Sequence, residues 1–399
     1  MRKLQALLLA LVLVTAAAGV AQDLRPVPRL GVVSTLPSHL HLPGTPPRLP
    51  WPRVGEAAVE VVGTGSLGAA GGNTPEPIGS VAKVMTALVV LRAHPLGPGA
   101  TGPLLTMTTQ DAAAYRADRA GQQSVVPVAP GEQLTELQLL EGLLIPSGNN
   151  LATILASWDA GSQAAFVAKM NALAAALGLR HTHYADASGL SPASVSTASD
   201  QVRLAAVAMR NPTFASIVAE PQVVLPLQGV AYNVNGLVTH DGVVGVKTGS
   251  TPQAGGCFVF AAQRTVGGHR VLILGAVLGQ GGLSVLTTAL DAGRRLVDAT
   301  AHALTTATLV TADAAVARIT VPWGHPVVVA APRTVTVVGW PGLVFRVRLT
   351  PAPLGRTVGT GTAVGVLSIT AGAAPVATET LRAPSPVRGP SLRWRLTRL

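Results

Sequence analysis

Ser80 and Lys83 are the first pair of residues whose types and spacing suggest covalent chemistry. They stand three residues apart at the start of an apolar segment with helical periodicity, so both side chains should lie on one helix face. A helix start stabilises negative charge, and a serine hydroxyl becomes a good nucleophile when a nearby amine takes its proton. The pair predicts nucleophilic catalysis, although Ser-x-x-Lys alone is a weak pattern.

Two further polar segments follow in the chain. Ser147 and Asn149 fall in a break between two predicted helices, where a hydroxyl and an amide can relay a proton and hold a carbonyl group. Lys247, Thr248 and Gly249 end an apolar strand and offer a positive charge, a hydroxyl for a carboxylate and room for a substrate backbone. Each segment is ordinary by itself. In this order, the three form the signature of penicillin-recognising serine enzymes.

Lysine is scarce in this chain, which otherwise uses arginine. The lysines are Lys3, Lys83, Lys169 and Lys247, and two of these four lie in the signature. An arginine cannot lose its proton in a protein, whereas a lysine amine can. This usage supports a chemical role for Lys83 and Lys247.

The elements that would position these residues come in two groups. Helical periodicity predicts helices over residues 80–92, 134–144, 150–157, 164–177, 199–209 and 286–299. Short apolar runs predict strands over residues 57–62, 243–248, 257–262 and 271–278, and then over 319–321, 327–330, 335–338, 344–349 and 364–369. The change to strand signals alone after about residue 305 predicts a separate β domain.

The chain resembles the low-molecular-mass penicillin-binding proteins that act as serine D-alanyl-D-alanine carboxypeptidases. Beyond the signature, the resemblance rests on residues 139–150, Met170-Asn171, Ser188-Gly189-Leu190, Ser196-Thr197-Ala198, 245–251 and 254–257. It covers about residues 57–381. It implies an α/β (α+β) fold: a DD-peptidase/β-lactamase-like domain with an antiparallel sheet flanked by helices and a helical subdomain, followed by a small all-β domain.

The expected domain organisation has five parts. These are a signal peptide (1–21), a Pro-rich linker (22–52), the catalytic domain (53–304), the small β domain (305–383) and a basic tail (384–399).

The resemblance also assigns roles at the site. The substrate would be the peptidoglycan stem peptide ending in D-Ala-D-Ala, attacked by Ser80 with Lys83 as base. Ser147 and Asn149 would shuttle the proton to the leaving amine and position the peptide. Penicillins and other β-lactams would acylate Ser80 and act as inhibitors. No cofactor or metal is implied.

The remaining assignments concern the strand motif. Lys247 and Thr248 would bind the terminal carboxylate, with Gly249 and Ser250 completing the substrate-binding segment. The backbone N–H groups of Ser80 and Ser250 would hold the oxyanion.

Three alternatives stay open at this point. A β-lactamase of the same fold would need a second base, and no such motif lies between Asn149 and Lys247. A non-catalytic cell-wall-binding protein would not need the intact signature. A zinc site is a third idea, because two histidine pairs are spaced by two, but no carboxylate or cysteine cluster joins them and surface histidines are expected. The pairs are His39 with His41 and His181 with His183.

Composition and the chain ends indicate an extracytoplasmic protein. Arg2 and Lys3 precede an apolar stretch at residues 4–14, and small residues offer cleavage after Ala18 or Ala21; an uncut membrane anchor is the alternative. The net charge of +11 suggests attraction to an anionic wall or lipid surface, whereas the lack of basic runs interleaved with aromatics argues against nucleic acid. The tail with Trp394 is expected either to contact a membrane surface or to fray.

Overall fold

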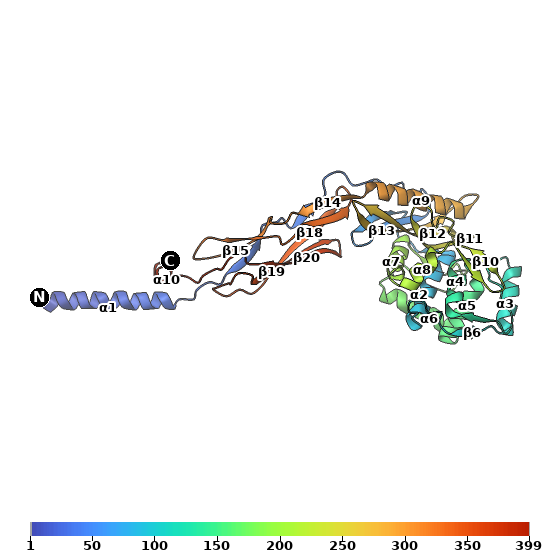
Figure 1. The fold of residues 1–399 in the computed structure, drawn as a ribbon, viewed down its shortest axis with the longest axis horizontal. Coiled ribbons are helices and arrows are strands. Elements are labelled where there is room, and N and C mark those ends of the chain that lie inside the picture. The colour runs from blue at the N-terminus through green and yellow to red at the C-terminus, as the bar shows by residue number, and fades with distance from the viewer. Residues whose placement is uncertain (1, 399) are drawn as a thin grey trace. The chain divides into compact units, whose positions relative to one another are not determined.

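The computed structural model describes residues 2–398 and divides the chain into two compact units (Figure 1). One unit comprises residues 47–305 and holds all three motif segments. The other combines residues 2–46 with residues 306–398. Each unit is considered by itself below.

The unit of residues 47–305 is organised around an antiparallel sheet. Its strand order is β11 (Val243–Thr251), β12 (Gly255–Val266), β13 (His269–Gln280), β3 (Glu56–Val61) and β4 (Gly65–Ala70). Alternation along β12 gives the sheet two buried faces. Phe258 and Phe260 lie against Gly293 of α9 (Val285–Ala303), while Val259 and Ala261 join the core shared with the other helices.

Helix α2 (Lys83–Ala93) forms the centre of the helical part. Nine of its eleven residues are buried, and a helix that is apolar on all sides belongs inside a domain. Around it lie α4 (Glu136–Leu144), α5 (Asn149–Ala160), α6 (Gln163–Ala176), α7 (Ala198–Ala208) and α8 (Pro212–Ala219). The expected fold class, with an antiparallel sheet, flanking helices and a helical part, is confirmed.

Several elements of this unit differ from the sequence-based expectation. The segment carrying Ser80 is a 3₁₀ helix, η1 (Gly79–Ala82), and the α-helix starts only at Lys83. Helix α3 (Thr109–Ala120) was not expected, because Ala112 is its one buried residue and its pattern lacks apolar periodicity. Helix α8 escaped prediction because it is only eight residues long.

Short strands complete the unit. They are β5 (Glu76–Pro77) with β8 (Val195–Ser196), β6 (Leu104–Thr106) with β7 (Gln133–Thr135), and the hairpin of β9 (Gln222–Leu225) with β10 (Gly229–Tyr232). The β7 strand takes up the first two residues of the helix expected over 134–144, so that α4 begins at Glu136 behind the capping residue Thr135.

The second unit is an all-β domain apart from two helices near its chain ends. Its four-stranded sheet has the order β2 (His39–His41), β18 (Val344–Pro351), β19 (Ala363–Ala371) and β20 (Ala374–Arg382). A three-stranded sheet contains β1 (Gly31–Ser34), β15 (Ala315–Thr320) and β16 (Val327–Ala330), and β14 (Thr305–Val310) pairs with β17 (Val335–Gly339). These sheets share one apolar core.

The expectation of a Pro-rich linker over residues 22–52 is wrong in part. Strand β1 pairs with β15 and strand β2 pairs with β18, so this segment supplies two strands to the β unit. Leu30, Val32 and Leu42 are buried in that unit's core. The sequence does not reveal these strands, because they are only three or four residues long, show no periodicity of their own and lie among prolines.

The N-terminal helix α1 (Arg2–Leu24) is longer than the apolar stretch expected from the sequence. Its 23 residues have a mean hydropathy of 2.3 over the most apolar window, and none is buried. A helix of this length extends about 34 Å, enough to cross a bilayer, and it runs through both expected cleavage sites. A signal sequence and a membrane anchor both satisfy these criteria.

The basic tail forms a short helix, α10 (Leu392–Thr397), next to the end of α1. The guanidinium group of Arg398 donates hydrogen bonds to the carbonyl groups of Gln22, Arg25 and Pro26. These bonds tie the tail to the last turn of α1 and to the two residues that follow this helix. Leu399, the last residue of the expected tail, lies outside the described residues.

Candidate active site

Ser80 and Lys83 are in direct contact. Ser80 is half-buried in η1, and Lys83 opens α2 with its side chain fully buried. The Lys83 Nζ lies 2.7 Å from the Ser80 Oγ. The three-residue spacing therefore places the amine within proton-transfer distance of the hydroxyl.

The Lys83 amine has two other polar neighbours. Its Nζ donates to the Oδ1 of Asn149 at 2.6 Å and to the backbone carbonyl of Ser188 at 3.1 Å. A neutral amine has two hydrogens and one lone pair. Because the two carbonyl oxygens accept the two hydrogens, the lone pair is left for the Ser80 O–H to donate to. The contacts thus suit an amine that removes the serine proton.

The electrostatic setting favours the neutral form of this amine. Burial holds the pKa of Lys83 well below its ordinary value of 10.5, and the positive charge of Lys247 lowers it further. The carboxylate of Asp186 acts in the opposite direction and raises the Lys83 pKa. Burial is the largest of these effects.

Strand β11 brings Lys247 to the same site. The Lys247 side chain is buried, its Nζ donates to the Thr248 carbonyl at 3.1 Å, and burial lowers its pKa to about 7. The strand lies directly against η1, because a Cβ on Gly249 would come within 2.8 Å of both the Ile78 carbonyl oxygen and the Ser80 amide nitrogen. Glycine at position 249 is what allows this approach.

Ser147 lies in the loop before α5, and Asn149 is the first residue of that helix, at the break between helices that the sequence predicts. Ser147 is buried and has a φ of +70°, a left-handed conformation that is uncommon for serine. Asn149 begins α5, where its backbone N–H donates to the Ser124 carbonyl at 2.8 Å. The structure brings Asn149 into contact with Lys83, while Ser147 lies two residues before Asn149 in the preceding loop.

Gln123 is a member of the site that the sequence did not reveal. Its Oε1 accepts a hydrogen bond from the Asn149 Nδ2 at 2.9 Å, which turns the Asn149 Oδ1 toward Lys83. Gln123 lies in the loop after α3, and no local pattern marks it. Only the three-dimensional contact with Asn149 identifies it.

Asp186 is the second residue that the sequence did not single out. Its carboxylate accepts hydrogen bonds from the N–H and Oγ of Ser188, at 3.2 and 2.6 Å, and from the Ser194 Oγ at 2.6 Å. It thereby fixes the loop whose Ser188 carbonyl contacts Lys83. The Ser188-Gly189-Leu190 segment is part of the family resemblance, which is the signal that could have led to Asp186.

A groove of about 380 Å³ adjoins these contacts. Gln123, Asn149, Asp186 and Ser188 all line it, together with residues from α3, α5 and the loop before β8. Asn149 and Ser188, which both contact the Lys83 amine, thus border this groove.

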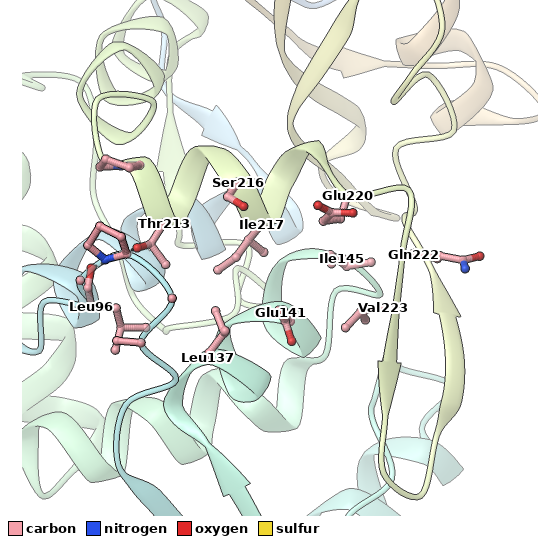
Figure 2. Close-up of a pocket in the computed structure, with 15 residues that line it drawn as sticks. Leu96, Leu137, Glu141, Ile145, Thr213, Ser216, Ile217, Glu220, Gln222 and Val223 are labelled. Atoms are coloured by element: carbon pink, nitrogen blue, oxygen red, sulfur yellow. Dashed lines mark hydrogen bonds between the residues drawn. The ribbon is translucent and has the colours of Figure 1, made fainter.

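A second pocket, of about 550 Å³, lies away from these residues (Figure 2). In Figure 2, Thr213 and Ile217 of α8 face Leu137 and Glu141 of α4 across it. Burial raises the pKa of the Glu141 carboxyl, and nearby Glu220 raises it further. None of the residues that the sequence predicts for the active site lines this pocket.

A comparison with known protein families identifies the chain. The sequence profile of the D-alanyl-D-alanine carboxypeptidase family matches residues 64–280, which is more than half of the chain. The chain belongs to this family. The expected family, fold and hydrolase class are thus confirmed, and the β-lactamase and non-catalytic alternatives are not favoured.

Individual relatives agree with this assignment. The chain is 39% identical over 208 residues to the D-alanyl-D-alanine carboxypeptidase DacB2 of Mycobacterium tuberculosis, a match that covers 50% of this chain and 66% of that protein. It is 36% identical over 217 residues to the D-alanyl-D-alanine carboxypeptidase of Streptomyces sp. strain K15, covering 50% of this chain and 72% of the relative.

Solved structures agree with it as well. The crystal structure of the Streptomyces K15 DD-transpeptidase superposes with a TM-score of 0.55 at 29% identity, covering 63% of this chain and 98% of the other. Penicillin-binding protein 5 of Haemophilus influenzae superposes with a TM-score of 0.63 at 21% identity, covering 86% of this chain and 100% of the other. This last match, which supports the fold alone, extends beyond the catalytic unit.

Proposed function

We propose that this protein hydrolyses the terminal D-Ala-D-Ala bond of peptidoglycan stem peptides through an acyl-enzyme on Ser80. The Ser80 Oγ attacks the carbonyl carbon between the two alanines while its proton passes to the neutral Lys83 amine. The amine of the terminal D-alanine then takes a proton and leaves, and water hydrolyses the ester. The observation that carries this proposal is the 2.7 Å contact between Ser80 and Lys83.

Asn149 and Ser147 are proposed to act during proton transfer to the leaving amine. Asn149 contacts Lys83 directly and also reaches the groove, so it is suited to orient the amine and a substrate amide together. Ser147 lies in the same buried loop and contributes a hydroxyl that can relay the proton.

Lys247 and Thr248 are proposed to bind the terminal carboxylate of the substrate, with Gly249 and Ser250 alongside. A lysine whose pKa is about 7 is partly protonated at neutral pH, and a bound carboxylate would stabilise its charged form. The Thr248 hydroxyl supplies a second donor for the same carboxylate.

The oxyanion of the tetrahedral intermediate is proposed to lie between the N–H groups of Ser80 and Ser250. Both nitrogens border the junction of η1 and β11. A Cβ on Gly249 would lie 2.8 Å from the Ser80 nitrogen, and a Cβ on Gly79 would lie 3.2 Å from the Ser250 nitrogen. Two amides at one junction fit an oxyanion hole.

Acylation by a β-lactam provides the direct test. Wild type and Ser80→Ala are incubated with a labelled penicillin, digested and analysed by mass spectrometry. The expected result is a covalent adduct on the peptide containing Ser80 in wild type and none in the variant. A folded wild-type protein that forms no adduct would overturn the proposed mechanism.

Substrate assays then separate the reactions that this fold supports. D-Alanine release from a peptide ending in D-Ala-D-Ala should exceed β-lactam turnover. The opposite ratio would favour a β-lactamase.

We further propose that catalysis takes place outside the cytoplasmic membrane, with α1 serving in export, and that residues 53–304 form the catalytic domain.

A further inference from the structure

The net positive charge of this protein comes from one of its two units. Residues 47–305 contain 15 lysines or arginines and 15 aspartates or glutamates, so that the catalytic unit is neutral overall. The remaining residues contain 14 basic and 3 acidic side chains, which accounts for the entire net charge of +11. Such an asymmetry between units indicates that the β unit faces an anionic partner.

Two of these arginines lie on the open face of the four-stranded sheet. Arg346 and Arg348 of β18 are exposed, and they alternate with Phe345 and Val347, which are buried in the core. Side chains two residues apart on a strand point to the same face, at a spacing of about 7 Å. The two guanidinium groups therefore form a row along β18.

The register extends this row across the sheet. Arg346 stands opposite His39 of β2 on one side and Thr370 of β19 on the other. Arg348 stands opposite Ser368, which in turn stands opposite Thr378 of β20. Directly opposed residues share a face of a sheet. The result is a surface of cationic, imidazole and hydroxyl groups, which we name the Arg346–Arg348 face.

Among the residues that the structure describes, no carboxylate neutralises the two arginines of this face. Neither Arg346 nor Arg348 forms an ion pair or a side-chain hydrogen bond with another described residue. Glu379 of β20 points to the opposite, buried side of the sheet, where it pairs with Arg333 at 2.6 Å. The two arginines are thus free to bind an external anion.

We propose that the Arg346–Arg348 face binds a linear polyanionic polymer of the cell wall, with phosphodiester groups contacting the two arginines and the neighbouring hydroxyls. A guanidinium group matches a phosphate through paired hydrogen bonds, and serine and threonine hydroxyls add further donors. A row of charges along a strand suits a polymer whose charges also recur along a line.

The composition of the face favours a polymer over a lipid surface. An element that lies in a membrane interface places apolar side chains in the acyl region, and α1 carries such exposed leucines. On this face, Val344 at the end of β18 is a large exposed apolar side chain, but the rows through Arg346 and Arg348 carry polar and charged groups. The Arg346–Arg348 face therefore offers a ligand mainly charge and hydrogen-bonding groups.

The test measures binding of the full chain, kept in mild detergent, to a synthetic poly(glycerol phosphate) at low and at physiological salt. The expected result is salt-sensitive binding by wild type and about tenfold weaker binding by Arg346→Gln/Arg348→Gln, as for two exposed charge contacts. Arg356→Gln/Arg388→Gln removes the same charge from exposed sites of the same unit and should bind nearly as wild type does.

Three outcomes would overturn the proposal. In the first, wild type does not bind the polymer. In the second, the two double variants weaken binding equally, which would show an effect of net charge alone. In the third, Arg346→Gln/Arg348→Gln would weaken binding to phosphatidylglycerol vesicles but not to the polymer. D-Alanine release from a soluble peptide should be unchanged in both variants, which keeps this test independent of the proposed catalysis.

Discussion

The Oδ1 of Asn149 accepts a hydrogen bond from the Lys83 Nζ at 2.6 Å, while the Nδ2 of the same amide donates to Gln123. One side chain therefore joins the proposed base to a residue that lies outside the three-part signature. Because an amide has distinct donor and acceptor ends, Gln123 determines which end Lys83 meets.

Replacing Gln123 tests this orientation. Gln123→Ala should lower kcat for D-alanine release by about tenfold with little change in KM, since the amide of Asn149 is freed to turn. Gln123→Glu retains an acceptor for the Asn149 Nδ2 and should recover most of the rate, with an altered pH profile from the added charge. Equal losses in both variants would count against a positioning role.

Replacing Lys83 tests the proposed base. Lys83→Arg retains a positive side chain that cannot give up its proton, and Lys83→Met removes the amine altogether. Both should slow acylation of Ser80 by at least about 10³-fold, because the serine loses its proton acceptor. Stopped-flow measurement of penicillin acylation would give the rates, and substantial activity in Lys83→Arg would exclude the base role.

Asp186 tunes the Lys83 amine and should shift the pH profile. Its carboxylate raises the Lys83 pKa, so Asp186→Asn should lower that pKa and move the acidic limb of the acylation profile to lower pH. The same change weakens the bonds to Ser188 and Ser194, costing on the order of 1–3 kcal/mol of stability. The acidic limb measured in both proteins gives the sign, and a shift to higher pH would contradict this account.

Stability should rise with pH because of Lys247. Its pKa is about 7 in the folded chain and 10.5 when unperturbed, so the unfolded chain binds more protons between these values. The free energy of unfolding should gain about 1.4 kcal/mol per pH unit from this group in that range. Urea unfolding at pH 7, 8 and 9 measures the slope, which should be smaller by this amount in Lys247→Met; identical slopes would refute the assignment.

Gly249 should tolerate no side chain. In Gly249→Ala, the new Cβ would meet backbone atoms of Ile78 and Ser80 at 2.8 Å, and η1 would have to move away from β11. We expect a stability loss on the order of 1–3 kcal/mol and a large loss of acylation. Gly281→Ala, where a Cβ meets nothing within 4 Å, is the matched control. Wild-type acylation in Gly249→Ala would show that the contact is unimportant.

The sequence predicts those site residues that lie in short local motifs, and it misses those identified only by three-dimensional contacts. Ser80 and Lys83 are joined by helical spacing, and Lys247-Thr248-Gly249 is an adjacent run, so pattern and position sufficed to nominate them. Gln123 acts through its contact with Asn149, which lies 26 positions further along the chain, and no pattern near Gln123 marks it. Asp186 binds its near neighbours Ser188 and Ser194, but its effect on the distant Lys83 cannot be read from that segment alone. The contact of Lys83 with Asn149 spans 66 positions and emerges only when α2 and α5 pack together.

The fold followed the same rule. Buried elements with long apolar runs, such as α2 and β13, were expected close to where they lie. Strands β1 and β2 were not, because each is too short for alternation to show and each pairs with a strand about three hundred residues further along the chain. Their place is decided by the core around Val32 and Leu42 rather than by local preference.

Cys257 gives this protein a built-in reporter of motion. It is fully buried on β12, stands opposite Gly249 in the register, and its thiol pKa is raised to about 12, mainly by burial. The folded protein should therefore react very slowly with thiol reagents. With a single cysteine in the chain, each labelling event would record an opening that exposes this thiol, so the opening rate of the core beside the proposed carboxylate-binding strand is measurable without an introduced probe.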